Sequence, residues 1–357
     1  MVEPLRKRTF SANNESLLTG MYVVESSNAK DLVIPHLPVI DKASINNGLW
    51  SSGVTSGDVV YYNQSTNRMR TILTSNSNEN TLLVTEQCEN RCLFCSQPPN
   101  ERDDIELYKN ATLALLNFNA ESVIGITGGE PTTNKKAFLT LLHQLDYFNN
   151  KTKLHILSHG RNLSDINFVE DIQKCIGSRE ISWGIPLYGH KSSLHNRLVN
   201  AQKAFDETLQ GIVNLSAFGQ VVEARIVPVT HNIHHLINII NFLVNSFQNI
   251  KQISIMNLEP IGWAKKNYLE LFVPVGKQNV YLNEVINICL AYGVSIQLYN
   301  YPLCLLNDNL RAFSVRSISD WKNYYPSGCN QCARQQVCGG FFTSSTGKYL
   351  EDVEPFQ

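Results

Sequence analysis

The 357-residue sequence has no long hydrophobic run and almost no net charge. Its most apolar stretch, residues 236–247, is too short to span a bilayer and is interrupted by asparagines. The formal net charge of −1 provides no basic field to hold nucleic acid, so we expect neither a nucleic-acid nor a membrane partner. Residues 1–16 carry charge but no apolar core follows, so we expect no signal peptide and a cytoplasmic protein.

Cysteine is the residue type that carries information here, because the chain has nine of them and no export signal. An odd number of cysteines in a long chain favours a reducing compartment, and it favours metal binding or redox chemistry over a framework of disulfides. Cys175 and Cys289 fall on the apolar sides of expected helices, where a buried free cysteine is ordinary, so we leave both out of any site. The other seven form two groups.

The first group is Cys88, Cys92 and Cys95, spaced C-x3-C-x2-C within TEQCENRCLFCSQPP (85–99). Structural zinc normally has four ligands, so three close thiolates leave a position open for chemistry. Iron–sulfur clusters are commonly held by four thiolates, and three ligands to a four-iron cluster leave one iron free for a small molecule. The apolar run at 82–85 predicts a short buried strand before the loop, and α/β folds place active sites at strand ends. Stray thiols or an incomplete zinc site are the alternative.

Apolar runs alternate with helical patterns from residue 82 onward. This alternation predicts right-handed βαβ units, a parallel sheet and a partial barrel. A further helix is expected at 276–292, followed by a strand at 294–299. The earlier strands are expected at 82–85, 123–127, 154–158, 181–188, 221–229 and 253–258, and the helices at 106–119, 135–149, 165–176, 197–215 and 233–247.

The two ends of the chain differ from this core. Residues 1–80 are rich in Ser, Asn and Gly without a helical pattern, and two apolar runs around the polar residues 63–67 predict a hairpin. We therefore expect a small β-rich N-terminal region at 1–80, whose strand edges would accept an extended leader peptide. The core is expected at 81–260. The tail at 261–357 has few periodic runs after residue 301 and needs a metal centre to hold it.

The second cysteine group lies in this tail and consists of Cys304, Cys329, Cys332 and Cys338. Four thiolates can close either a zinc site or a second iron–sulfur cluster, and spacing alone does not distinguish the two. The open cluster expected at the first group favours iron.

Small and charged residues follow the later strands. Gly128 and Gly129 would let a ligand approach the backbone, and Glu130 adds a carboxylate suited to an ammonium group. A plain strand-to-helix turn is the alternative. Ser158 can donate to a ribose hydroxyl, although a turn explains it equally well. Arg225, among apolar neighbours on a strand, is a candidate clamp for a carboxylate, with a solvated strand end as the alternative.

Together these motifs resemble the radical SAM (S-adenosylmethionine) superfamily over about residues 80–260. The resemblance implies a partial (β/α)6 TIM-like barrel. It also implies that Cys88, Cys92 and Cys95 hold a [4Fe–4S] cluster whose open iron binds the amino and carboxylate groups of SAM. Reduction would then cleave SAM to a 5′-deoxyadenosyl radical. Hydrogen abstraction by such a radical needs no catalytic side chain, and we assign none.

The same resemblance implies the remaining cofactor contacts. Phe94 matches an aromatic position whose backbone contacts adenine, and Glu130, after the two glycines, matches the residue near the methionine ammonium. Ser158 matches the ribose contact, although the usual Asn after it is His159 here. Arg225 matches the position that contacts the methionine carboxylate. SAM binding is thus expected at Phe94, Gly128, Gly129, Glu130, Ser158 and Arg225.

The tail is similar to the SPASM/twitch class of auxiliary-cluster domains, which is frequent among enzymes that modify ribosomally made peptides. More narrowly, several segments resemble the radical SAM maturases of the His-Xaa-Ser system (HxsC). These are CSQPP, MNLEPIGWA (256–264), YNYPLC (299–304), SISDWKN (317–323) and CGGFF (338–342). The resemblance implies a precursor peptide with His-Xaa-Ser repeats, a partner radical SAM maturase, and an electron donor such as flavodoxin or ferredoxin. A radical SAM enzyme for a small molecule or nucleobase, and a non-catalytic iron–sulfur or zinc scaffold, are the alternatives.

Overall fold

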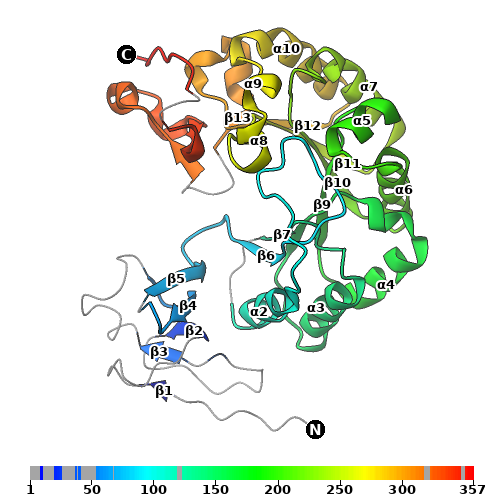
Figure 1. Ribbon diagram of the computed structural model, residues 1–357, viewed down its shortest axis with the longest axis vertical. Helices are drawn as coiled ribbons and strands as arrows, with labels where there is room; N and C mark the ends of the chain where they lie inside the picture. Colours follow the sequence, from blue (N-terminus) through cyan, green and yellow to red (C-terminus); the bar gives the residue numbers. More distant parts are fainter. Residues whose placement is uncertain are drawn as a thin grey trace. The chain divides into compact units, whose positions relative to one another are not determined.

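The structure is a computed structural model that describes residues 9–10, 20–25, 37, 39–41, 54–66, 68–118, 123–316, 322–346 and 350–357 (Figure 1). The chain divides into two compact units. The first unit comprises residues 1–85, 102–156 and 171–181. The second comprises residues 86–101, 157–170 and 182–357, and it contains both cysteine groups.

A five-stranded sheet in the first unit confirms the expected β-rich N-terminal region. β4 and β5 pair antiparallel with Tyr61 opposite Arg70, which confirms the predicted hairpin. Tyr22, Val60 and Tyr62 are buried together and give this sheet its own small core. Residues 32–34, a further apolar run of the N-terminal sequence, lie outside the described residues. The strand order is β1 (Thr9–Phe10), β3 (Val39–Asp41), β2 (Gly20–Glu25), β4 (Val59–Asn63) and β5 (Arg68–Leu73).

The main sheet is parallel and eight-stranded, in the order β13-β12-β11-β10-β9-β8-β7-β6. Consecutive strands are neighbours, as expected for repeated βαβ units. β6 and β13 stand at opposite ends of this order, so the sheet matches a partial barrel, as predicted. The strands are β6 (Thr81–Thr85), β7 (Ile124–Gly128), β8 (Leu154–Leu157), β9 (Ile181–Pro186), β10 (Val221–Ile226), β11 (Ile250–Met256), β12 (Ser295–Tyr299) and β13 (Ser314–Val315).

The helices follow the predicted positions with one correction. The single helix expected at 197–215 is wrong, because Asn200 and Lys203 take left-handed φ values of 48° and 60° that end one helix and precede another. Two short helices at 262–271 were not expected, since one turn is too short to show a period. The helices are α2 (Ile105–Leu116), α3 (Lys135–Tyr147), α4 (Ile166–Ile176), α5 (Ser192–Val199), α6 (Ala204–Ala217), α7 (Leu236–Ser246), α8 (Gly262–Lys266), α9 (Tyr268–Leu271) and α10 (Val275–Ala291).

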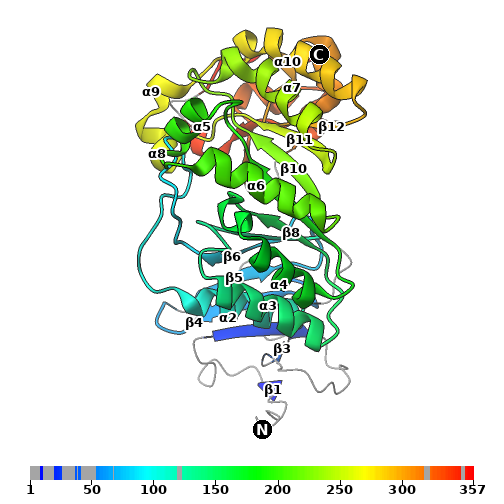
Figure 2. The ribbon, with the colours of Figure 1, turned by 90° about the vertical axis from the view of Figure 1, so that its right-hand side faces the viewer.

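Alternating side chains give β10, β11 and β12 two different faces. The helices α6 and α10 pack on one side of these strands (Figures 1 and 2). One set of alternate side chains is apolar and buried, with Ala224 on β10, Ile253 on β11 and Leu298 on β12. The opposite face is polar. Burial of the apolar face stabilises the second unit at roughly 25 cal/mol per Å² of apolar surface removed from water.

The chain after β13 contains short 3-10 turns and one small hairpin. β14 (Asn323–Tyr324) pairs antiparallel with β15 (Phe341–Phe342). Within the described part of this tail no α-helix forms, in agreement with its irregular sequence. Residues 317–321 of the SISDWKN segment lie outside the described residues.

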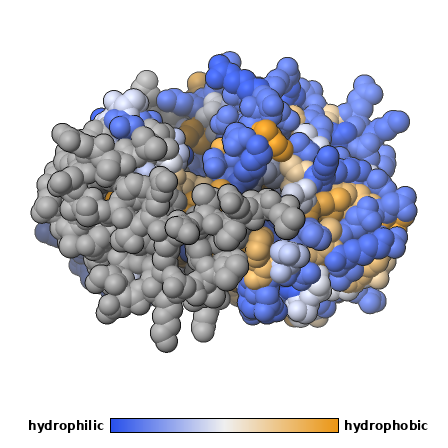
Figure 3. Space-filling model, turned by 90° about the horizontal axis from the view of Figure 1, so that it is seen from below, coloured by the Kyte–Doolittle hydropathy of each residue, from blue (hydrophilic) through white to orange (hydrophobic). Residues whose placement is uncertain are grey.

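The described surface is mainly hydrophilic in the view of Figure 3, with smaller apolar areas between polar ones. Apolar side chains scattered in this way are ordinary for a globular protein. Across the described ranges, no helix has both the length and the apolar character that a membrane span requires.

Candidate functional site

The first cysteine group lies on an irregular loop, residues 86–101, directly after β6. The end of α5 holds one part of this loop through the backbone. The Arg91 N–H donates to the carbonyl of Val199 at 3.0 Å, and the Leu93 N–H donates to the carbonyl of Leu198 at 2.9 Å. These bonds fix the backbone on either side of Cys92 without using a side chain.

A second element, α8, holds the other end of the loop. The Trp263 N–H donates to the Cys95 carbonyl at 2.9 Å, and the Asn267 amide donates to the Leu93 carbonyl at 2.7 Å. Gly262 comes so close to the loop that its backbone leaves no room for a side chain. The MNLEPIGWA segment therefore has a direct structural role, because it supports the cysteine loop.

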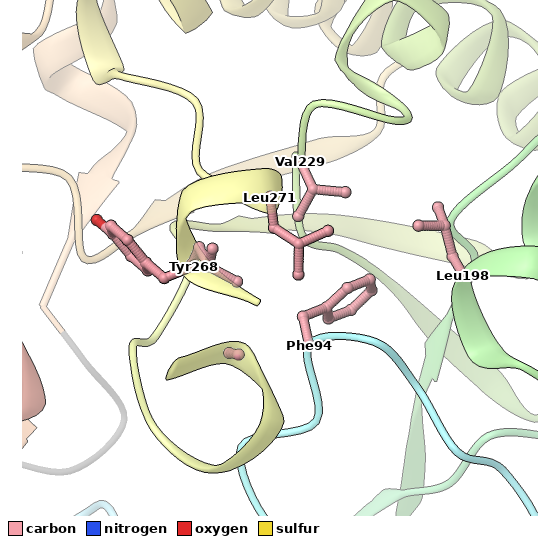
Figure 4. Close-up of a cluster of buried hydrophobic side chains, with 7 residues drawn as sticks. Phe94, Leu198, Val229, Tyr268 and Leu271 are labelled. Carbon is pink, nitrogen blue, oxygen red and sulfur yellow. The ribbon is translucent and has the colours of Figure 1, made fainter. Parts of the chain in front are cut away.

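Phe94 anchors the loop by its side chain. It is 7% exposed and extends toward Val229 and Leu271, as Figure 4 shows. Its ring meets Tyr188 edge to face, with centroids 4.7 Å apart. Burying a phenylalanine contributes about 1.5–3 kcal/mol, so this contact helps to hold the loop in place. The predicted adenine contact would use the Phe94 backbone and stays a prediction.

The three thiols of the loop lie near one another, and none of the three forms a disulfide. Burial raises the pKa of the Cys92 thiol, and charge on Cys95 and Cys88 raises it further. Burial also raises the pKa of Cys95, whose Sγ donates to the carbonyl of Gln97 at 2.9 Å. Thiols that oppose one another's ionisation ionise readily once they bind a metal, and a three-sulfur donor set suits iron–sulfur chemistry.

Charged residues between the cysteines connect the loop to the end of β8. Glu89 Oε2 lies 3.0 Å from Nε2 of His159, and Asn162 donates to Glu89 Oε1 at 3.4 Å. Arg161 donates to the side chain of Asn90 at 2.7 Å. The sequence pattern did not predict these contacts. The only available signal was the polar Glu-Asn-Arg run between two cysteines, with basic residues after a later strand.

Glu89 is strongly favoured as a carboxylate. Burial alone favours its neutral form, but the hydrogen bond and charge of His159, with bonds from the backbone and Asn162, lower its pKa to about 2. Cys88 Sγ, a Glu89 oxygen and a His159 nitrogen lie within 4.8 Å of one another. This group competes with the three cysteines as a metal site, since it also combines donors that metals use.

The glycine turn after β7 lies in the first unit. A side chain at Gly128 would meet the Thr85 carbonyl at 2.6 Å, and the Gly129 N–H donates to that same carbonyl at 2.8 Å. Glu130 is fully buried, and its carboxylate accepts the N–H of Thr132 at 2.9 Å. The turn thus has a structural reason for its first glycine, and its contact with a cofactor stays a prediction.

Ser158 and Arg225 both have protein partners in the second unit. Ser158 is 3% exposed, and its hydroxyl accepts the Gly160 N–H at 3.0 Å. Arg225 Nη1 donates to Glu223 at 3.1 Å, and Nη2 donates to the sulfur of Met256 at 2.9 Å. A cofactor carboxylate would therefore compete with Glu223 for Arg225. The roles assigned to Ser158 and Arg225 stay predictions.

Tyr188 links the loop to the polar face of the sheet and was missed by the sequence analysis. Burial raises the pKa of its hydroxyl, charge on Cys92 would raise it further, and Arg225 has the opposite effect. These influences place the hydroxyl near both the thiols and Arg225. His195 stacks against the Tyr188 ring, with centroids 5.9 Å apart. No sequence pattern singles out this tyrosine, since it is the last residue of the strand predicted at 181–188 and belongs to no motif.

His195 gives the site a testable pH dependence. Burial, with charge on His159 and Arg161, lowers the pKa of His195 to about 3, and its Nδ1 accepts the Tyr188 N–H at 3.1 Å. Below pH 6.5 His195 binds a proton in the unfolded chain but stays neutral in the folded chain. The free energy of unfolding should therefore fall by about 2 kcal/mol between pH 7.5 and pH 5 from this group.

Urea unfolding at pH 7.5 and pH 5.0 measures this loss. His195→Asn keeps an acceptor for the Tyr188 N–H and does not titrate, so it should lose about 2 kcal/mol less than the wild type over the same interval. Equal losses in the two proteins would contradict a buried, neutral His195.

The second cysteine group surrounds one open cavity of about 360 Å³. The Sγ of Cys338 accepts backbone N–H groups from Leu303 at 3.3 Å and Gly340 at 3.4 Å. Burial raises the pKa of Cys304 and of Cys329, and the neighbouring thiols add to both shifts. Four sulfurs with N–H groups directed at one of them fit a closed metal centre, either zinc or an iron–sulfur cluster. Cys304, Cys329, Cys332 and Cys338 all line the cavity.

The last residues of the chain cover part of this cavity. Val353, Pro355 and Phe356 line it. The guanidinium groups of Arg311 and Arg334 each lie 4.7 Å from the centroid of the Phe356 ring. This pair of cation–π contacts fixes an aromatic wall beside the four sulfurs.

One family model and several known proteins are similar to this chain. A family model described as the radical SAM superfamily matches residues 82–243. An uncharacterized protein of Methanocaldococcus jannaschii is 27% identical over 207 residues, which cover 57% of this chain and 70% of the relative.

Two solved structures are also similar. SuiB of Streptococcus suis, bound to S-adenosylmethionine, is 16% identical with a TM-score of 0.50, covering 63% of this chain and 51% of SuiB. This chain thus spans about half the length of SuiB, and the likeness concerns the fold. Native anSMEcpe with bound AdoMet and Kp18Cys peptide is 16% identical with a TM-score of 0.46, covering 61% of this chain and 63% of that one. The cysteine loop, the glycine turn and Ser158 all fall inside residues 82–243, the part of the chain that the radical SAM superfamily model matches.

Proposed function

We propose that this protein is a radical SAM enzyme that modifies a ribosomally made peptide with His-Xaa-Ser repeats. The observation that carries the proposal is the pairing, within one unit, of an open three-cysteine loop and a separate four-cysteine cavity. The resemblance of five tail and loop segments to the His-Xaa-Ser maturases supplies the substrate class.

Cys88, Cys92 and Cys95 would hold a [4Fe–4S] cluster that, with bound SAM, supplies a 5′-deoxyadenosyl radical. The chain's own residues keep the loop in register: Leu93 through its bond to α5, and Phe94 through its buried ring. Because these anchors do not use the thiols, the loop can be ordered before a metal binds. Such preorganisation of ligands favours tight metal binding.

Cys304, Cys329, Cys332 and Cys338 would hold an auxiliary iron–sulfur cluster. All four cysteines line the same cavity. A four-iron cluster with four cysteine ligands has no open iron, so this centre would serve electron transfer or peptide placement. The domain plan that goes with this proposal is residues 1–80 as a leader-binding region, 81–260 as the core and 261–357 as the auxiliary region. A flavodoxin or ferredoxin would supply electrons, and a partner maturase would share the precursor.

Co-expression with a precursor peptide that carries His-Xaa-Ser repeats tests the proposal. We expect mass spectrometry to show a changed mass in the repeat region, absent when Cys92→Ala replaces the wild type. Release of 5′-deoxyadenosine that depends on a metabolite, and not on any such peptide, would contradict the peptide substrate. Stable zinc without SAM cleavage would contradict the enzyme itself.

The two cysteine groups should respond differently to mutation. In Cys332→Ala the auxiliary site loses a ligand while the loop at 86–101 is untouched, so peptide modification should be lost and SAM cleavage retained. Iron content after anaerobic reconstitution should fall from about eight to about four atoms per chain. Cys175→Ala, a half-buried cysteine on α4, is the matched control and should keep both values.

A further inference from the structure

The polar face of β10, β11 and β12 is unusual for a parallel sheet. Strands of parallel sheets are usually buried on both faces and read as nearly continuous apolar runs. Here alternate positions are polar and half-buried or buried, and the strand register places them in rows, with Glu223 beside Gln252 and Ser254 beside Gln297. We define this polar face as Glu223, Arg225, Gln252, Ser254, Gln297 and Tyr299.

A hydrogen-bond network orients two glutamines on this face. Gln252 Nε2 donates to Ser254 Oγ at 3.0 Å and to Gln297 Oε1 at 3.1 Å. The Tyr299 hydroxyl donates to the same Gln297 oxygen at 2.6 Å. The network uses the nitrogen of Gln252 and the oxygen of Gln297. It therefore fixes which end of each carboxamide remains available.

The two remaining ends form a complementary pair. In the part of the chain that the structure describes, Gln252 Oε1 is an acceptor and Gln297 Nε2 a donor without a protein partner. An acceptor on β11 and a donor on the neighbouring strand β12 match the N–H and C=O that one residue of an extended peptide presents on the same side of its backbone. The nearest charges, Glu223 and Arg225, are paired with each other at 3.1 Å, so this part of the face does not select a charged group.

The polar face adjoins the cysteine loop. Phe94 of the loop packs against Val229 and Leu258, which follow β10 and β11 directly. The Tyr188 ring meets Phe94 of the loop, and the N–H of the preceding Leu187 donates at 3.1 Å to the carbonyl of Arg225, which belongs to the polar face. A group bound by the glutamines would therefore lie along the strands that lead to the loop.

We propose that Gln252 and Gln297 bind the backbone N–H and C=O of one residue of the substrate peptide, with Ser254 and Tyr299 orienting the two carboxamides. The inference rests on the proposed peptide substrate. Backbone groups are the ligand because one acceptor and one donor suffice for them, whatever side chains the peptide carries. The pair would thus place the chain of the peptide, while other contacts choose the residue.

Binding of a defined probe tests this proposal. The probe is a capped, fluorescent peptide of four His-Ala-Ser repeats, titrated by anisotropy against the cluster-loaded enzyme with SAM. Gln252→Met and Gln297→Met each remove a hydrogen bond to the amide, so each should raise the Kd about fivefold to tenfold. Gln144→Met, at an exposed position of α3, should leave the Kd unchanged. Matching iron content and melting temperature show that each variant is folded.

A second probe identifies the amide itself. Replacing one peptide N–H at a time by an ester oxygen removes the N–H that would donate a hydrogen bond to Gln252 Oε1. At one position the ester should weaken binding to the wild type but not to Gln252→Met, so the two changes are not additive. If the wild type does not bind the peptide, both the proposed function and this inference are wrong. If the wild type binds and both Met variants bind equally well, only the amide site is wrong.

Discussion

Cys92→Ala is expected to reduce SAM cleavage to background. Cys92 is the middle ligand of the triple, and α5 fixes the backbone on both sides of it. Burial raises the pKa of its thiol, and the other two thiols raise this pKa further. Removing it leaves two sulfurs, too few for a four-iron cluster that needs three protein ligands. Formation of 5′-deoxyadenosine from SAM after reduction with dithionite, measured with the iron content, checks this result.

The same variant separates two metal sites that share Cys88. A mononuclear site of Cys88, Glu89 and His159 does not use Cys92 and would keep its metal in Cys92→Ala. A cluster held by the three cysteines would lose iron in this variant, whereas Cys175→Ala would retain it. SAM cleavage at the wild-type rate in Cys92→Ala would therefore rule out the three-cysteine cluster and leave the mononuclear site as the alternative.

Local pattern predicted much of the fold. Apolar runs located β6 to β12 because each buried strand needs a run of its own. The cysteine spacing marked the loop because three cysteines within residues 88–95 are close enough in the chain to meet at one metal centre. The break between α5 and α6 was not predicted. It depends on left-handed backbone at Asn200 and Lys203, and these two polar residues would be equally ordinary on the exposed face of a continuous helix.

Contacts between distant segments account for what the sequence did not show. Nothing in the spacing of residues connects Glu89 to His159, which are 70 positions apart, or Cys95 to Trp263. Arg225 illustrates the same limit: its charge was noticed, but its bonds to Glu223 and Met256 depend on strand register. A sequence motif thus identifies the residues that contact a ligand, but it does not identify the distant residues that hold those ligand contacts in place.

Gly262→Ala is expected to damage the cysteine loop from outside it. Gly262 has a left-handed φ of 59°, and a Cβ there would lie 2.6 Å from the carbonyl oxygens of Cys95 and Ser96 and 2.8 Å from Cδ of Pro98. Contacts this short force the loop or α8 to move, which breaks the Trp263 N–H bond to the Cys95 carbonyl. Backbone strain of about 1–2 kcal/mol adds to overpacking of about 1–3 kcal/mol.

A second glycine separates strain from contact. Gly293 has a similar φ of 65°, but a Cβ added there would meet no atom within 4 Å, so Gly293→Ala carries the backbone strain alone. Gly262→Ala should lose about 2–5 kcal/mol in urea unfolding and most of its bound iron, while Gly293→Ala loses about 1–2 kcal/mol and keeps its iron. Equal iron contents in the two variants would mean that α8 does not shape the cluster site. A selective loss would show that the cysteine triple depends on a residue 167 positions after Cys95, which explains why the loop and MNLEPIGWA belong to one functional unit.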